Sequence, residues 1–265
     1  MNILMLSLLS ISLFSLGTIY QGLVYLKKIK ARHFVSLLVG AGAVTSQLIA
    51  TVDHVFVDNQ FILDFFNSAS IITCLIVIYL LIFSSKKPLH AIFLAVYPFA
   101  ALSMLGILVF HDDSRSFAPE NSGIFIHIIL SMIAYSVLTI AAIQAILIQL
   151  QNNNLKKKNH TILLRNLPPL LTMEKLLFEM LWSGTILLAL AILAGMIFIE
   201  DIFAQHLAHK TFLSILALGV FTSLLIGRKV HGWRGITASK WTLWGTGFLM
   251  LGFFGSKLIL EQLIH

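Results

Sequence analysis

Three polar side chains share one face of a predicted helix inside an apolar stretch, and they are the residues best placed to do chemistry. His127, Ser131 and Tyr135 are spaced i, i+4 and i+8, so they lie above one another on a helix. Polar stripes of this kind in a membrane helix face the bundle interior or a ligand. The structural alternative is that Ser131 and Tyr135 bridge to neighbouring helices and that a carbonyl group satisfies His127.

Further histidines flank predicted membrane segments on the same side as His127, namely His54, His111, His206 and His209. Imidazole is an axial ligand of haem iron and a common ligand of other metals. Two histidines from different segments at one membrane face would therefore sandwich a haem. For His54, His111 and His206 the simpler alternative is a solvated side chain.

Arg115 and Lys210 are two of only three cations outside the basic loops described below. A charge-assisted contact with a haem propionate would be one reason for a cation at these positions. Snorkelling of Lys210 from the start of its helix is the other.

A tight basic turn is predicted at Gly232-Trp233-Arg234-Gly235. Two glycines permit a backbone path that other residues resist, while Trp233 and Arg234 suit headgroup or cation-π contacts. The motif is equally well explained as an interfacial hairpin between two helices.

The elements that must position these residues are membrane helices. Hydrophobic residues make up 58% of the chain and charged residues 11%, against roughly 45–50% and about 25% in a soluble domain. A bilayer core of about 30 Å needs roughly 20 helical residues. About eight apolar runs meet this requirement, the seventh being short: 3–25, 34–54, 64–84, 91–110, 124–150, 176–199, 211–226 and 241–260. The fold class is therefore all-α, a polytopic integral membrane helix bundle forming a single domain over residues 1–265. The polar segment 151–172 predicts a connector between two four-helix halves.

The cations orient this bundle. Fifteen of the eighteen Lys and Arg residues lie in four loops, at 27–32, 86–87, 156–175 and 228–240, and such loops stay on the cytoplasmic side. The first run lacks a basic segment before it, so we expect an uncleaved helix. Both termini are then periplasmic in a bacterial inner membrane. Because the cations flank membrane segments and form no stripe on one domain, lipids are the expected partners and nucleic acid is not. Cys74 is the single cysteine, so no intramolecular disulfide is possible.

Four motifs together resemble the cytochrome c assembly protein family, and within it the YpjD group of inner membrane proteins, relatives of CcsA and HemX. They occur in the order GIFIHIILSMIAY at 123–135, LPPL at 167–170 followed by Met173 and Glu174, GWRG at 232–235, and GFFGSK at 252–257. The similarity runs nearly end to end.

This resemblance implies haem handling at the outer membrane face, with His127 at the position of the family's outer haem-ligating histidine. Two departures stand beside it. The haem-delivering members carry a tryptophan-rich loop before the seventh helix, whereas residues 200–210 contain no tryptophan. Related proteins also carry a histidine in the middle of the second helix, where this chain has Gln47, and His54 at i+7 is a candidate replacement.

We therefore expect a haem-binding or haem-channelling membrane protein, not an enzyme, that holds haem b between His127 and a second histidine, with His209 favoured. Its expected partners are lipids and membrane proteins of cytochrome c biogenesis or ion efflux. One alternative is an accessory subunit or regulator of magnesium or cobalt efflux. Another is a structural membrane regulator without a cofactor.

Overall fold

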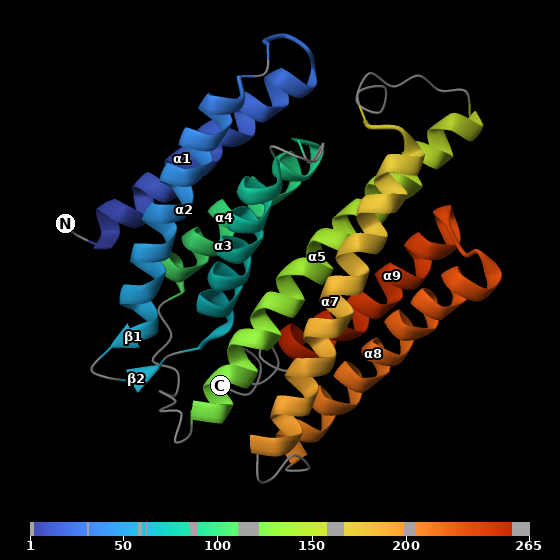
Figure 1. Ribbon diagram of the computed structural model, residues 1–265. Coiled ribbons are helices and arrows are strands. Elements are labelled where there is room, and N and C mark those ends of the chain that lie inside the picture. Colours follow the sequence, from blue (N-terminus) through green and yellow to red (C-terminus); the bar gives the residue numbers. More distant parts are fainter. Residues whose placement is uncertain are drawn as a thin grey trace. The chain divides into compact units, whose positions relative to one another are not determined.

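The computed structural model describes residues 3–30, 32–57, 60–61, 63–84, 90–110, 122–157, 167–198 and 205–255. Apart from two very short strands, the elements in this part are helices (Figure 1). The predicted all-α membrane bundle is therefore confirmed. The chain forms two compact units, Met1–Ala118 and Pro119–His265.

The first unit is a ring of four helices, α1 (Ile3–Tyr25), α2 (His33–Val55), α3 (Phe65–Ser84) and α4 (His90–Val109). Each helix packs against the next, and α4 closes the ring on α1. Two-residue strands β1 (Phe56–Val57) and β2 (Gln60–Phe61) follow α2 and pair antiparallel, with Phe56 opposite Phe61.

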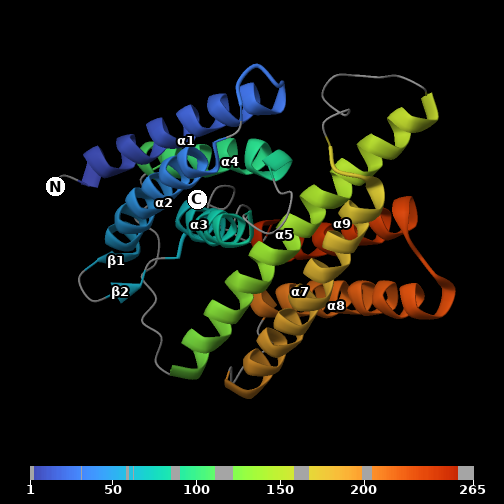
Figure 2. The same ribbon diagram turned by 45° about the horizontal axis from the view of Figure 1, so that its top comes forward.

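The second unit repeats this arrangement with α5 (Ser122–Lys157), α7 (Leu170–Phe198), α8 (Gln205–His231) and α9 (Gly235–Met250). Here α5 packs on α7 and α9, and α8 also packs on both α7 and α9. Figures 1 and 2 both show α8 and α9 side by side as a hairpin. A short π-helix, η1 (Leu251–Gly255), continues α9 without a break.

The predicted division of the chain at 151–172 is wrong, because the first compact unit ends at Ala118 and the second begins at Pro119. The longest helix, α5, packs along α7 and so belongs to the second unit. A polar connector in the sequence shows where the chain leaves the bilayer. It does not show which helices pack together.

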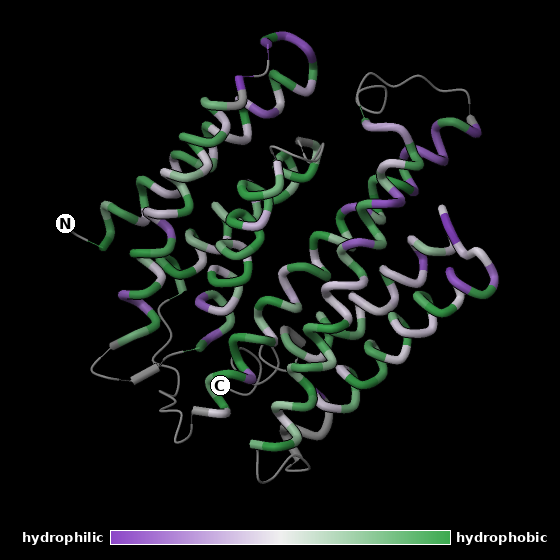
Figure 3. The backbone as a smooth tube through the Cα atoms, viewed as in Figure 1, coloured by the Kyte–Doolittle hydropathy of each residue, from purple (hydrophilic) through white to green (hydrophobic). Residues whose placement is uncertain are grey.

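Seven helices of the described part are long and apolar enough to cross a membrane, and α9 alone, at sixteen residues, is not among them. The predicted apolar runs match their positions. Several helices extend beyond the runs, most of all α8, which has 27 residues instead of a short span. The helix is longer than the apolar run because it includes polar turns at both ends. Arg228, Lys229 and His231 in its last turn stabilise the C-terminal end, where the helix dipole is negative. Figure 3 shows these polar ends against apolar helix centres.

Tyr97 is the largest fully buried side chain of the first unit. Its ring centroid lies 5.4 Å from that of Phe14 and 5.3 Å from that of Phe93. A Cβ atom placed on Gly17 would be 2.7 Å from the Tyr97 ring, and one on Gly40 would be 2.6 Å from its hydroxyl oxygen. Small residues thus let α1 and α2 approach α4, as is usual in membrane bundles.

A layer of buried polar side chains joins α2, α3 and α4 in the first unit. The Gln47 amide donates to the Ser70 hydroxyl at 3.0 Å and to the Thr73 hydroxyl at 3.1 Å. Thr51 and Ser70 share a hydrogen bond of 2.7 Å, and Thr73 shares one of 3.1 Å with Ser103. These bonds satisfy groups that lipid cannot.

Replacing Gly17 by alanine tests the packing around Tyr97. Overpacking costs about 1–3 kcal/mol, while replacing a helical glycine gains about 1 kcal/mol. We expect Gly17→Ala to lower the free energy of unfolding in detergent by on the order of 1 kcal/mol, because the aromatic rings around Tyr97 leave it no room to move. Gly247→Ala is the control, since a Cβ atom there meets nothing within 4 Å. Equal stability of the two variants would contradict this account.

Candidate functional site

His127 lies in the second turn of α5, half-buried against α7. Its Nδ1 atom is 2.6 Å from the Ala191 carbonyl oxygen. A carbonyl oxygen only accepts hydrogen bonds, so Nδ1 must carry the proton and donate it. In the neutral imidazole the lone pair is then on Nε2. This is the tautomer that a metal-ligating histidine adopts when a backbone carbonyl orients it.

Gly195 on α7 makes room for this imidazole. A Cβ atom on Gly195 would lie 2.9 Å from both Nδ1 and Cε1 of His127. One turn further out, Phe198 of α7 packs against Gly123 of α5. A glycine from each helix therefore permits the close approach that places the imidazole beside Ala191.

Tyr135 lies two turns along α5 from His127 and contacts different helices. Its buried hydroxyl donates to the Leu249 carbonyl at 3.4 Å and has a side-chain hydrogen bond with Ser214 of α8. The ring centroid of Phe253 is 5.1 Å from that of Tyr135. Tyr135 thus bridges α5 to α8, α9 and η1. Together with the contact between His127 and a backbone carbonyl of α7, this is the arrangement that the structural alternative for the polar stripe predicts for these two residues.

The start of α8 lies at the same end of the second unit. A Cβ atom on Gly252 of η1 would lie 3.2 Å from Leu213 and 3.7 Å from the Lys210 carbonyl oxygen. We call this region, formed by the start of α5, the end of α7, the start of α8 and η1, the His127 end. Lys210 is half-buried there, and His209 precedes it in α8. For His209 and His206 the structure describes the helix backbone but not the side chains.

The other residues predicted for this site either lie outside the described residues or belong to the first unit. Arg115 and His111 lie outside the described residues. His54 belongs to the first unit, where it is half-buried in the last turn of α2. Gln47 is fully buried in the polar layer of that unit. Within the part of the chain that the structure describes, no group of three or more His, Cys, Asp and Glu side chains could hold a metal ion.

The predicted turn at Gly232-Trp233-Arg234-Gly235 joins α8 to α9. Gly232 and Gly235 have φ angles of 66° and 59°, values that favour glycine. The Trp233 ring packs on Gly227 and lies 5.1 Å from the Trp241 ring and 5.9 Å from the His231 ring. Arg234 precedes α9 in an extended conformation and is exposed.

Sequence reasoning missed Ala191 and Gly195, the two α7 residues that hold His127. The signal was present as Ala191 and Gly195 spaced four apart in the sixth apolar run, because small residues at this spacing mark close helix contacts. Which helix they would meet was not readable from that spacing.

The family model for the cytochrome C assembly protein matches residues 33–264. This chain belongs to the cytochrome c assembly protein family. The match runs through both units and includes His127, the buried Gln47 and the turn between α8 and α9.

Curated relatives agree with this family assignment. The chain is 28% identical to inner membrane protein YpjD of Escherichia coli (strain K12) over 231 residues, covering 84% of this chain and 87% of the relative. It is 32% identical over 141 residues to an uncharacterized 28.8 kDa protein in the nifR3-like 5'region of Azospirillum brasilense, covering 52% of each chain. No solved structure matches the chain.

Substitutions of Tyr135 test whether its ring packing or its hydroxyl hydrogen bonds contribute more to the stability of the second unit. Tyr135→Phe removes only the hydroxyl, with its long 3.4 Å bond to Leu249 and its bond to Ser214, so we expect a loss of about 1 kcal/mol in the free energy of unfolding. Tyr135→Ala also removes the buried ring and should cost about 3–5 kcal/mol. Unfolding of the purified protein in detergent measures both. A phenylalanine variant as unstable as the alanine variant would contradict the conclusion that ring packing dominates.

Proposed function

We propose that this chain is a haem-binding protein of the inner membrane, with His127 as an axial ligand through Nε2. The observation that carries the proposal is the 2.6 Å contact between His127 Nδ1 and the Ala191 carbonyl oxygen. Membership of the cytochrome c assembly family supports a haem-related membrane role. The relative named inner membrane protein YpjD and the seven apolar helices support the multi-pass location.

The residues present fit a haem ligand. The Ala191 carbonyl fixes the ring orientation and the tautomer of His127, so that Nε2 keeps the lone pair that iron requires. The half-buried position limits competition from water, and the neighbouring helices are apolar. Haem b, when bound, supplies an iron that accepts axial imidazoles and two propionates that carry negative charge.

The second ligand in this proposal is His209. It lies one residue before Lys210 at the start of α8, and α8 borders the same end of the unit as His127. Lys210 and Arg115 are the proposed propionate partners, since a cation beside a carboxylate forms the stronger class of hydrogen bond. His54, the other second ligand that the sequence predicts, belongs to the first unit.

The proposed role is binding and transfer, with no catalytic step. Membrane proteins of cytochrome c biogenesis are the proposed partners, together with lipids. Delivery of haem to apocytochrome c is not included in this transfer role, because residues 200–210 lack the tryptophans of the haem-delivering relatives. An accessory role in magnesium or cobalt efflux remains a prediction from the sequence.

The haem proposal predicts a Soret band with bis-histidine character for the purified full chain in detergent. His127→Ala should abolish or shift this band, since the ligand is removed. Gly195→Ala should weaken haemin binding by about tenfold, because its methyl group displaces the imidazole from the Ala191 carbonyl, and loss of such a support typically costs 10–100-fold in affinity. Absorption titration with haemin measures both effects.

His231→Ala is the matched control, because this exposed histidine ends α8 in the turn opposite the His127 end. It should leave the spectrum unchanged. A colourless wild-type protein that haemin does not titrate would exclude haem binding. A spectrum that survives His127→Ala would exclude His127 as the ligand.

The orientation predicts that the His127 end faces the periplasm and the turn between α8 and α9 faces the cytoplasm. A variant with a single cysteine, made in the protein with Cys74→Ser, tests this orientation in cells. Asn153→Cys, exposed near the end of α5, should react with a membrane-impermeant maleimide only after the inner membrane is permeabilised. Labelling of intact spheroplasts would place the proposed haem site on the cytoplasmic side.

A further inference from the structure

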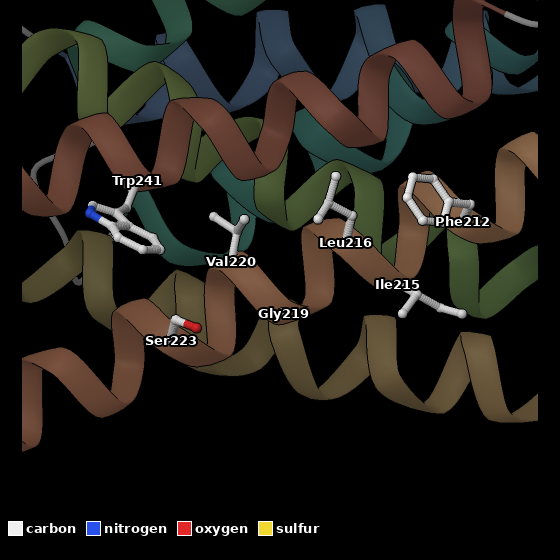
Figure 4. A pocket seen from close by; sticks show the side chains of 7 residues that line it. All are labelled: Phe212, Ile215, Leu216, Gly219, Val220, Ser223 and Trp241. Carbon is white, nitrogen blue, oxygen red and sulfur yellow. The ribbon is translucent and has the colours of Figure 1, made fainter.

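An apolar groove runs along α8 of the second unit and ends at Trp241 of α9 (Figure 4). It has a volume of about 420 Å³ and is lined by Phe212, Ile215, Leu216, Gly219, Val220, Ser223 and Trp241. Six of these residues recur every three or four positions, so the groove follows one face of α8. The volume falls in the range of roughly 300–1,000 Å³ that small-molecule sites occupy.

The groove is open at its middle and walled by exposed apolar side chains. A Cβ atom on Gly219 would meet nothing within 4 Å, so the missing side chain leaves space. Phe212 is 66% exposed and Ile215 49% exposed. In a bilayer such a surface is covered by hydrocarbon, and a concave surface makes more contacts with a flexible chain than a flat one does.

The Trp241 end of the groove carries positive charge. Trp241 packs against Trp233 in the turn between α8 and α9, with the two ring planes tilted by 34°. Around that turn Lys229, Arg234 and Lys240 are exposed. Residues 228–240 contain no Asp or Glu, so these cations have no acidic neighbour in sequence. The fourth cation, Arg228, lies 3.5 Å above the Phe178 ring of α7 and faces away from the groove.

We propose that this groove binds an anionic phospholipid, with one acyl chain along α8 from Trp241 towards Phe212 and the phosphate against Lys229, Arg234 and Lys240. The apolar groove and the cationic turn adjoin at Trp241, which matches the arrangement of an acyl chain and its headgroup. Tryptophan at this junction is suited to the headgroup level. The proposal does not rest on haem binding.

A lipid fits these observations better than a helix from a second copy. Trp241 lies at one end of the groove (Figure 4) and packs against Trp233 of the cationic turn, so the occupant must carry a negative group next to an apolar segment. Glu174 of α7 places a carboxylate beside this turn, 3.4 Å from a Cβ atom placed on Gly235. Three exposed cations still leave the turn net positive, and an anionic headgroup supplies the counter-charge that an apolar helix does not.

Native mass spectrometry of the detergent-purified full chain tests the proposal with two probes, palmitoyl-oleoyl phosphatidylglycerol and palmitoyl-oleoyl phosphatidylcholine. The wild type should retain the anionic lipid preferentially. Replacing both Arg234 and Lys240 by glutamine should lower its affinity about thirtyfold, from the loss of two interfacial cations, with little effect on phosphatidylcholine. Gly219→Leu fills the groove and should reduce retention of both lipids about tenfold.

Two control variants in the second unit make the same kinds of substitution at residues that neither line the groove nor belong to the turn between α8 and α9. Lys156→Gln with Lys175→Gln removes two other exposed cations, and Gly247→Leu places a leucine at another open helical glycine. Both should retain phosphatidylglycerol as the wild type does. Equal retention of the two lipids by the wild type, or equal losses in variants and controls, would overturn the proposal. So would a dimer that Gly219→Leu dissociates while lipid retention is unchanged.

Discussion

Hydrocarbon offers no hydrogen bonds, so every polar group within the membrane must find its partner inside the protein. In the first unit the Gln47 amide nitrogen meets this requirement with the hydroxyl groups of Ser70 and Thr73, while its Oε1 atom is buried without a hydrogen-bond partner among the described residues. In the second unit His127 meets half of it, since Ala191 satisfies Nδ1. The same constraint therefore yields a hydrogen-bonded polar layer in one unit and an imidazole with a defined ligating atom in the other.

Glycine residues determine how closely neighbouring helices can approach one another. At Gly195 the absent side chain gives the His127 ring its place against the α7 backbone. At Gly17 it receives the buried ring of Tyr97, and at Gly245 it receives the ring of Phe221. At these three positions a ring fills the space that a missing Cβ atom leaves, while Gly184 of α7 receives the aliphatic side chain of Leu138 instead.

Hydropathy alone located the helices, because the length and apolar content of a span follow from bilayer thickness. Helix ends were less predictable: Gln205 and His231 lie in polar turns that hydropathy assigns to loops, yet they belong to α8. The sequence also predicted the polar face of α5 but not its partners. Ala191 and Leu249 contribute only backbone carbonyls, which every residue carries, so a small-residue spacing such as that of Ala191 and Gly195 marks a helix contact without identifying the hydrogen-bond acceptor.

The change from α-helix to π-helix at Leu251 has a consequence for Tyr135. The Leu251 amide is shared between the carbonyls of Gly247 and Phe248, and η1 begins there. Phe253, on the π-helical side, covers the Tyr135 ring, while Leu249, on the α-helical side, receives the Tyr135 hydroxyl. A one-residue slip that returned η1 to the α-helical register would rotate Phe253 by about 100°. The Tyr135 ring would then lose its contact with Phe253, while its hydroxyl would keep the Leu249 carbonyl as acceptor. The burial of the Tyr135 ring therefore depends on whether residues 251–255 are π-helical or α-helical.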